Sequence, residues 1–538
     1  MPERNQLIRP LDESLQDYLS DESRLQGTAE WIAMPATEQD IKDILSKATR
    51  ERIPITISSG RTGITGGAVP SGGLVLSLEK MNRILAVGYD DASSEWYLRT
   101  QPGVSMEAIQ RALDKKEFPE IGKTASQEEM NDLKRLLKED IDLFYPPDPT
   151  EKTALLGGAA ACNASGARTF GFGPTRDFIR RLRIALVSGD IIDLPRGRII
   201  ADEKGIMHLP LEDRTMSIPV PGYTMPETKN TAGYYAKPGM DLVDLFIGSE
   251  GTLGIITEIE IRLVPRPSHI LAVMIYFSCE EDAVKFVRFV RGDEAIDLEV
   301  SHLLRAQALE YFDPDAVELL REKHRQQGLG GAIPPIPDHA KAIVYYERLY
   351  SDDRITDELC EGLEEALSLT NSSLDDTWAE FDPEGAEKMR DFRHAVPEEV
   401  NSMIGRIQAE NPGITKLGTD FAVPDEHLET LMNMYRTRLE ETGLRFVIFG
   451  HIGDNHLHVN IIPHDETDYE KGKNLYEEFA REVVKMGGTV AAEHGIGKLK
   501  KNLLHLMLGE HGIEEMIRIK KLLDPQNLLN KENLFGRL

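Results

Sequence analysis

The sequence predicts an α+β protein built from two or three domains. Its 538 residues exceed what a single hydrophobic core usually organises. Apolar residues recur with the periods of strands and of helices in alternating segments. After Pro267 the short strands and glycine turns give way to longer helical and acidic stretches, which continue to about Asn411. We therefore expect a first domain over residues 1–267 and a separate α+β domain beginning at residue 268.

The segment from Glu30 to Ser59 predicts a β-α-β unit. A short apolar run from Trp31 precedes apolar residues at helical spacing, and the β-rich stretch IPITI follows them. Thr37 and Asp40 have the spacing of a capping box and mark the expected start of the helix. The second strand leads directly into a glycine-rich loop, SSGRTGITGGAVPSGG.

The rest of the first half predicts more strands, one helical insertion and a hairpin. Strands are expected in LVLSLEKMNRIL and WYLRTQPG. Residues 113–141 are rich in charge and predict a solvated helical excursion at the surface. Residues 181–195 alternate around Ser188, Gly189 and Asp190, as a β-hairpin would. Residues 242–267 predict a glycine turn followed by another strand.

The second half predicts a strand over HILAVMIYF, a helix over EEDAVKFVRFVR and a polar C-terminal third. The polar residues of interest gather in KLGTDFAVP, LRFVIFGHIGDNHLHVNIIP and MGGTVAAEHGIG. A helix followed by a turn is expected in the tail, MIRIKKLLDPQNLLNKENLF.

Charge and cysteine content exclude several functional classes. The formal charge of −29 repels phosphate backbones and anionic lipids, which argues against nucleic-acid and membrane-surface roles. A carboxylate substrate would need local cations. Cys162, Cys279 and Cys360 are far apart, so they predict a reducing compartment and exclude a cysteine-held iron–sulfur cluster. The N-terminal residues lack the apolar core of a signal peptide, and no stretch is apolar enough to span a bilayer, so we expect a cytoplasmic protein.

Two glycine-rich loops, SSGRTGITGG and GGAAACNASG, have the composition of a phosphate-binding backbone. Glycine permits positive φ and lets amide groups crowd around an anion. Neither loop matches the dinucleotide fingerprint or the P-loop, so neither motif supports a nicotinamide or ATP site. Together with the turn over residues 248–255, the loops suit a long cofactor with a central diphosphate. The alternative, three unrelated tight turns, stays open on these residues alone.

A run of histidines predicts a polar face on one strand. In HLHVN, His456, His458 and Asn460 alternate with apolar residues, so the three share one face of a strand. His451 precedes them across a bend, and Glu493 comes from a distant glycine-flanked segment. Imidazoles with a carboxylate suit zinc, manganese or iron. Taken alone, such histidines are as compatible with a structural role as with metal ligation.

Seven ordered motifs resemble one known family across residues from about Trp31 to Phe535. The motifs are SGRTGITGGAVP, YPPDPTEKTALLGGAAACNASG, FGPTRD, LFIGSEGTLGIIT, GHIGDNHLHVN, AEHGIG and LLDPQNLLN. With these motifs in this order, the chain is similar to the FAD-linked oxidases related to vanillyl-alcohol oxidase, and within them to the D-lactate, glycolate and D-2-hydroxyglutarate dehydrogenases.

The resemblance implies a two-subdomain α+β FAD-binding domain over residues 1–267. It further implies an α+β cap domain with an antiparallel sheet over residues 268–490 and a C-terminal segment, 491–538, that returns to the FAD domain. No motif indicates covalent attachment, so we expect non-covalent FAD. The residues implied for it are Ser59, Gly60, Arg61, Thr62, Gly63, Ile64, Thr65, Gly66, Gly67, Pro147, Asp148, Pro149, Gly157, Gly158, Asn163, Ser165, Gly166, Gly173, Glu250, Gly251, Gly254, Ile255, Ile256 and Asn530.

The resemblance also implies a divalent metal and a substrate site. By position, the metal ligands are His451, His458 and Glu493, the catalytic base is His494, Asn460 lies beside the substrate, and Arg393 binds its carboxylate. The role of His456 is open, because relatives often have asparagine there.

One position departs from the pattern of the relatives that act on a hydroxy-diacid. These carry a lysine two residues before the aspartate of Lys-Tyr-Asp, where this chain has Gly418. Lys416 could substitute by another path, yet a lactate- or glycolate-like acid, or a bulkier one, is preferred over 2-hydroxyglutarate.

The expected function is FAD-dependent oxidation of a small 2-hydroxy acid to the 2-oxo acid, with metal-assisted proton abstraction and hydride transfer to flavin N5. The acceptor is open between a quinone, a cytochrome, an electron-transfer flavoprotein and a partner iron–sulfur subunit. Alternatives are an FAD oxidase acting on another alcohol and a flavin-bearing relay subunit of a larger complex. The oligomeric state is open, with a homodimer as one option.

Overall fold

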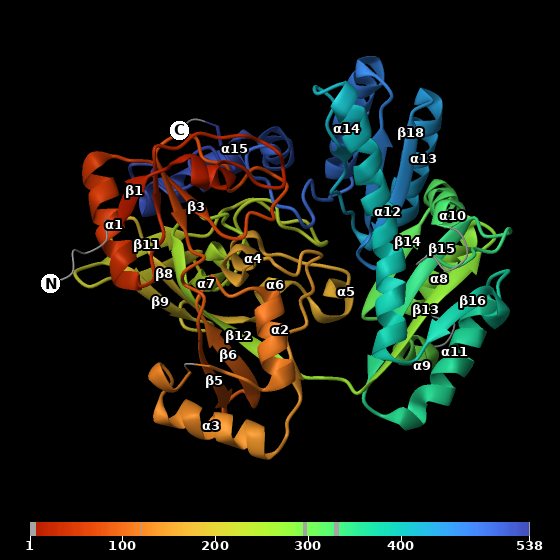
Figure 1. Cartoon of the computed structure of the whole chain (residues 1–538), viewed down its shortest axis with the longest axis horizontal. Coiled ribbons are helices and arrows are strands. Elements are labelled where there is room, and N and C mark those ends of the chain that lie inside the picture. Colours follow the sequence, from red (N-terminus) through yellow and green to blue (C-terminus); the bar gives the residue numbers. More distant parts are fainter. Residues whose placement is uncertain (1–6, 120, 294–297, 328–332, 537–538) are drawn as a thin grey trace.

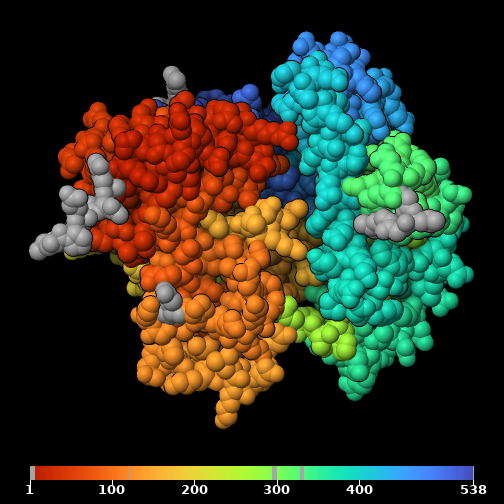
Figure 2. All heavy atoms as spheres, in the orientation of Figure 1, coloured from red at the N-terminus to blue at the C-terminus, as the bar shows by residue number. Residues whose placement is uncertain are grey.

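The computed structural model describes residues 7–119, 121–293, 298–327 and 333–536. Figure 1 shows two bodies side by side, one formed by the first half of the chain with the C-terminal tail and the other by the second half. The space-filling view in Figure 2 shows a furrow between them on this face. Among the described residues, no helix has the combination of length and apolar composition that crossing a bilayer requires.

The N-terminal sheet contains the predicted β-α-β unit. Its three parallel strands follow the order β2 (Trp31–Ala33), β4 (Leu74–Ser77) and β3 (Ile55–Ser58). Strand β1 (Ile8–Pro10) pairs antiparallel with β2. Helix α1 (Glu38–Glu51) begins at the expected capping box, in which Thr37 and Asp40 each accept from the other's backbone amide. The glycine-rich loop therefore leaves the C-terminal end of a buried strand.

A second sheet completes the first body. Its order is β5 (Ile84–Asp90), β6 (Glu95–Thr100), β12 (Ile255–Pro265), β8 (Ile179–Ala185) and β9 (Ile191–Pro195), with β7 (Leu143–Phe144) beside β12. Strands β8 and β9 form the predicted hairpin. Other elements of this body are η1 (Glu13–Leu19), α2 (Met106–Lys115), η2 (Ile121–Lys123), α4 (Leu156–Cys162), α5 (Thr169–Phe172), α6 (Thr175–Phe178), β10 (Ile206–Pro210), β11 (Thr215–Pro219) and α7 (Leu242–Phe246).

The predicted surface excursion is helical, but one of its faces is not solvated. Helix α3 (Gln127–Lys138) buries Leu133 and Leu136 in the core beneath the second sheet. Glu129 is also buried, with its carboxylate 2.9 Å from the Arg99 guanidinium on β6. The expectation of a solvated insertion was wrong for this face, because apolar residues at helical spacing lie hidden among the charges.

The second body is built on one antiparallel sheet, as predicted. Its order is β16 (Thr377–Glu380), β13 (His269–Phe277), β15 (Ala342–Tyr350), β14 (Ala308–Phe312), β18 (Arg445–His451), β19 (His456–Ile462) and β17 (Leu417–Gly418). Its helical elements are α8 (Glu280–Arg291), α9 (Leu298–Leu303), α10 (Pro314–Gln327), η3 (Asp353–Ile355), α11 (Thr356–Ser368), η4 (Leu374–Asp376), α12 (Pro383–Glu410), η5 (Asp425–His427), α13 (Leu428–Thr442), η6 (Ile452–Asp454) and α14 (Glu466–Lys485).

The C-terminal tail returns to the first body. Helix α15 (Lys501–Leu523) is followed by a turn whose backbone lies parallel to β3, with Ile55 bonded to Leu528 and to Asn530. The buried ammonium of Lys520 donates hydrogen bonds to the carbonyl of Thr252 and to the carboxylate of Asp524, each 2.6 Å long. These bonds hold the tail against the glycine turn that precedes β12 (Figure 1).

Candidate active site

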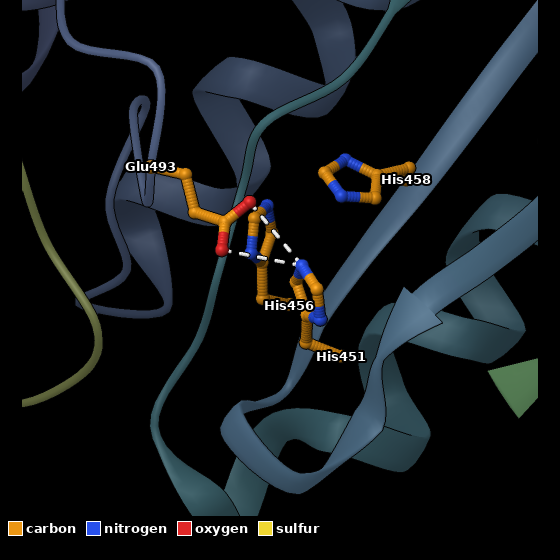
Figure 3. Close-up of side chains that lie close together, drawn as sticks. All are labelled: His451, His456, His458 and Glu493. Atoms are coloured by element: carbon orange, nitrogen blue, oxygen red, sulfur yellow. Dashed lines mark hydrogen bonds and ion pairs between the residues drawn. The ribbon is translucent and has the colours of Figure 1, made fainter. Parts of the chain in front are cut away.

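Four potential metal ligands gather at one end of the cap sheet. The ligand atoms of His451, His456, His458 and Glu493 all lie within 4.8 Å of one another. In Figure 3 the Glu493 carboxylate points toward His451 and His456, while His458 projects from its strand beside them. The structure therefore brings together the three ligands predicted from the sequence and adds His456, whose role was open.

A tight connection between two strands produces this geometry. His451 ends β18 and pairs with His456 at the start of β19, across the short helix η6. Asn455 takes a left-handed conformation at φ 51°, and its side chain donates 3.2 Å to the carbonyl of Val423. With the turn held, alternation along β19 puts His456 and His458 on one face, their ring centroids 4.4 Å apart.

Buried carboxylates surround His451. Its Nδ1 lies 2.6 Å from Oε1 of Glu310, and its Nε2 lies 3.2 Å from Glu493. Burial opposes a charged ring, but Glu310 and Glu493 outweigh it and raise the pKa of His451 to about 9. Sequence reasoning missed Glu310, which lies on β14 and carries no local motif.

Glu493 connects the cluster to the first body. Its Oε1 accepts from Lys229 Nζ at 2.5 Å and from Ser165 Oγ at 3.2 Å. Although burial favours the neutral acid, His451 and Lys229 hold the pKa of Glu493 well below its usual range. Lys229 was not predicted, because nothing in the pattern of its own segment indicates a partner so distant in sequence. Ser165, a predicted FAD residue, thus contacts a predicted metal ligand.

Asp420 anchors the segment that carries Glu493 and His494. Its carboxylate accepts the backbone amides of both residues, each at 3.0 Å, and the Lys500 ammonium at 2.6 Å. Nδ1 of His494 lies 3.3 Å from the same carboxylate, and Nε2 of His456 lies 3.1 Å from it without hydrogen-bond alignment. Against the effect of burial, His494 and Lys500 hold the pKa of Asp420 well below its usual value.

For the hydroxy-acid oxidation predicted from the sequence, we expect Asp420→Asn to lower kcat about 10- to 100-fold with little change in KM, the range typical of residues that orient functional histidines. An amide cannot accept the same set of donors, so the His494 ring loses its fixed orientation. Steady-state kinetics on FAD- and metal-loaded protein measure the effect. Asp313→Asn is the matched control, because Asp313 is equally buried but pairs with Arg436 away from the cluster. An unaltered kcat in Asp420→Asn would contradict the assignment.

Two predicted substrate contacts carry buried polar atoms without partners. Among the described residues, neither Nε of Arg393 nor Oδ1 of Asn460 has a hydrogen-bond partner. The rest of the Arg393 guanidinium is held, with Nη2 2.8 Å from His394 Nε2 and Nη1 3.4 Å from Glu310. Unsatisfied buried polar groups are costly, so these atoms are candidates to meet a ligand.

The side chain of Lys416 lies next to Gly418, the position that departs from the family pattern. Gly418 pairs with Asn460, and a Cβ on Gly418 would stand 3.3 Å from Cε of Lys416 and 3.1 Å from Oδ1 of Asn460. The Lys416 ammonium itself donates to Asn401 at 3.0 Å. The aliphatic part of Lys416 thus occupies some of the space that a side chain at residue 418 would fill. The ammonium group of Lys416 is directed to Asn401.

The loop over residues 59–67 has the properties of an anion cradle. Within the described structure, the amides of residues 60–67 donate no hydrogen bond to another residue. Arg61 and Gly66 adopt positive φ values of 59° and 76°, which turn successive amides toward one side. The hydroxyl of Ser59 is buried and has no partner among the described residues. Unpaired amides that gather beside a buried hydroxyl can bind an anion, so this loop fits a diphosphate.

The other predicted FAD segments converge on this loop. A Cβ on Gly158 would lie 3.0 Å from Oγ of Ser59, and one on Gly251 would lie 2.7 Å from Nδ2 of Asn530. Asn530 accepts from the Ile57 amide at 2.7 Å and donates to the Glu250 carbonyl at 2.6 Å. The two glycine-rich loops, the turn before β12 and the tail therefore meet at the end of β3.

The remaining predicted FAD residues flank this meeting point. Gly166 packs so closely on Asp148 that a Cβ would lie 2.1 Å from its carbonyl oxygen. Burial raises the pKa of Asp148 to about 6, and Arg168 and Arg393 limit the rise. Gly173 lies in a local turn against Asp177. The others lie on the segments already described: Pro147 and Pro149 after β7, Gly157 and Asn163 at α4, and Gly254, Ile255 and Ile256 at the start of β12.

Comparison with known proteins agrees with this geometry. Residues 266–534 match the family described as FAD linked oxidases, C-terminal domain, and residues 29–120 match an FAD binding domain. The chain belongs to the FAD-linked oxidase family. This membership confirms the resemblance seen in the motifs and supports FAD as the cofactor.

Relatives along almost the whole chain define the branch. The chain is 26% identical to a D-lactate dehydrogenase of Anaerostipes hadrus, covering 98% of this chain and 94% of the relative. It is also 26% identical to the glycolate oxidase subunit GlcD of Bacillus subtilis, covering 95% and 90%. A D-2-hydroxyglutarate dehydrogenase of Xanthomonas citri pv. viticola is 26% identical, covering 94% and 89%. The chain is an FAD-linked oxidoreductase of this branch.

Solved structures confirm the fold class. An alkyldihydroxyacetonephosphate synthase matches with a TM-score of 0.62 at 14% identity, covering 98% of this chain and 82% of that chain. A second structure of a synthase of that name matches with a TM-score of 0.58, covering 94% and 78%. At this identity the likeness concerns the fold alone, which is the mixed α+β fold of the vanillyl-alcohol oxidase type.

Proposed function

We propose that the chain oxidises a small 2-hydroxy acid, D-lactate- or glycolate-like, to the 2-oxo acid with FAD and a divalent metal. The observation that carries the proposal is the bond between Ser165, on a predicted FAD segment, and Glu493 in the histidine cluster. It brings a metal-type ligand set next to the cofactor segment. The names of the relatives support the same substrate class.

The donor set suits zinc, manganese or iron. Imidazole nitrogens with one carboxylate are the usual protein ligands of these ions. His451, His458 and Glu493 would hold the metal, and His456 is close enough to be a fourth ligand. When bound, a metal here would act as a Lewis acid toward the substrate hydroxyl, and FAD in the glycine loops would accept the electrons of the oxidation.

The residues of the chain then have distinct tasks. Arg393 binds the substrate carboxylate, with its buried Nε free for the contact among the described residues. His494 takes the hydroxyl proton on Nε2, because Nδ1 faces Asp420. The side-chain amide of Asn460, whose buried Oδ1 has no partner among the described residues, lies beside the same ligand. Holding the reacting groups in one orientation is itself a large part of the rate enhancement in such sites.

The absence of a side chain at residue 418 favours a substrate with a single carboxylate. The position opposite Asn460 has no side chain, and the nearby Lys416 ammonium donates to Asn401. A second substrate carboxylate would therefore lack a cation at the place where diacid enzymes of the family carry one. Lactate- and glycolate-like acids need only Arg393.

Electrons must leave the flavin through an external acceptor, such as a quinone, a cytochrome, an electron-transfer flavoprotein or a partner iron–sulfur subunit. The chain itself has three cysteines, too few for a cluster held by four. One relative is named as a subunit, which supports assembly into a larger complex as the alternative role.

Anaerobic flavin reduction tests the proposal. Purified holoprotein is mixed with D- and L-lactate, glycolate and D-2-hydroxyglutarate, and the flavin absorbance is followed. We expect bleaching by a mono-acid, loss of bleaching after metal removal with a chelator, and recovery on adding Zn²⁺ or Mn²⁺. If metal-loaded protein stays oxidised with every member of a broad 2-hydroxy acid panel, the substrate class is wrong.

A further inference from the structure

Glu310 is a buried carboxylate that contacts two groups with proposed functions. It lies on the central cap strand β14 and is 3% exposed. One of its oxygens, Oε1, lies 2.6 Å from Nδ1 of His451 and 3.4 Å from Nη1 of Arg393. His451 is a proposed metal ligand, and Arg393 is the proposed contact for the substrate carboxylate. No feature of the sequence around Glu310 indicated this role.

The contact with His451 determines which ring nitrogen faces the cluster. A carboxylate accepts hydrogen bonds, so Nδ1 carries the proton that it donates to Glu310. Nε2 is then the nitrogen directed at Glu493, 3.2 Å away, where the other ligand atoms gather. Carboxylates that orient metal-binding histidines in this way typically contribute 10- to 100-fold to metal affinity or activity.

The contact with Arg393 restrains the second group. Helix α12 supplies the arginine, and its guanidinium is held between Glu310 and Nε2 of His394. Burial and the proximity of Arg393 lower the pKa of His394 to about 4, so this ring is neutral and accepts the bond. Among the described residues, the remaining donor at Nε is unpartnered. The guanidinium is thus held through Nη1 and Nη2, and Nε remains available to a ligand.

We propose that Glu310 is a positioning residue that sets the spacing between the metal and the substrate carboxylate. One oxygen anchors both His451 and Arg393, so the metal ligand and the carboxylate contact cannot shift independently. A 2-hydroxy acid places its hydroxyl one carbon from the carboxylate, and a fixed spacing selects this arrangement over a 3-hydroxy acid. The inference deepens the proposed function and rests on it.

The test uses Glu310→Gln, which keeps the size of the side chain but removes its charge. FAD-loaded, metal-stripped protein is titrated with Zn²⁺ in the presence of a competing chelator. We expect the Kd for Zn²⁺ to rise about 10- to 100-fold. At saturating Zn²⁺, we expect the preference in kcat/KM for 2-hydroxybutyrate over 3-hydroxybutyrate to fall about tenfold or more, because small misplacements of reacting groups are costly.

Glu347→Gln is the matched control. Glu347 is a buried glutamate on the neighbouring strand β15, but it pairs with Arg168 at 2.7 Å and Arg390 at 3.5 Å. The same chemical change there should leave the Zn²⁺ affinity as in the parent protein. Glu310→Asp is the second variant should the glutamine variant not fold. Its carboxylate is one methylene short of its partners, and it should show the same two changes.

Zn²⁺ affinity within twofold of the parent, or an unchanged preference between the two acids, overturns the role of Glu310. Failure of the proposed function gives a different result, since the parent protein itself would then bind no Zn²⁺ at the cluster or oxidise no 2-hydroxy acid. The Zn²⁺ titration does not depend on turnover, so a positioning role is separated from a simple loss of activity.

Discussion

His494→Ala is expected to lower the rate of flavin reduction by a 2-hydroxy acid about 10²- to 10⁴-fold, the usual contribution of a positioned general base. The imidazole projects from the segment anchored by Asp420, and its ring stacks at 5.8 Å between centroids on His458. It is the group proposed to take the hydroxyl proton. Its neighbours in the glycine loop and in the histidine cluster stay in place, so FAD and metal contents should be unchanged.

Stopped-flow flavin bleaching under anaerobic conditions measures this effect, with FAD and metal quantified in the same samples. The control is His511→Ala, which removes an exposed imidazole on α15. It should bleach at the parent rate. A His494→Ala protein that is reduced as fast as the parent, with FAD bound, would remove His494 from the mechanism.

His458→Ala should lose the metal while retaining FAD. Nδ1 of His458 lies 3.0 Å from the carbonyl of Thr419, so Nε2 is the nitrogen left for an ion. Loss of a direct ligand should lower the metal affinity by more than the roughly 10- to 100-fold typical of residues that only orient a ligand. The loop that fits the diphosphate belongs to the other body, and the hydrogen bond of this ring goes to Thr419, so the flavin should stay. Hydroxy-acid oxidation should fall with the metal.

Metal analysis by mass spectrometry and the flavin absorbance of the same preparation provide the measurement. His464→Ala is the control, because His464 follows β19 closely in sequence yet is exposed. Parent-level metal in His458→Ala would exclude this residue as a ligand. Joint loss of metal and FAD would contradict separate binding of the two.

Local rules predicted those parts of the fold in which neighbours in sequence decide the structure. The capping box of Thr37 and Asp40 begins α1, and the turn near Gly189 joins the strands of a hairpin. Alternation along β19 correctly placed His456 and His458 on one face. In each case the interaction spans a few residues, so the pattern of the sequence contains it.

The charge content of one segment led to a wrong expectation about its burial. Residues 113–141 were expected to be solvated, but Leu133 and Leu136 of α3 face the core. Glu129 is buried as well, because Arg99 from a separate strand neutralises it. An ion pair between distant segments cannot be recognised from composition, since either residue alone is typical of a surface.

By itself, the sequence determined the fold class, the family and the set of candidate ligands, because motifs and periodicity are local and ordered along the chain. Only the tertiary structure decided which groups act on those ligands. Glu310, Lys229 and Asp420 reach the cluster from separate strands and loops, and each has its effect through a contact between residues far apart in sequence. Hydrogen bonds and charges act over a few ångströms in space, so their partners are chosen by folding.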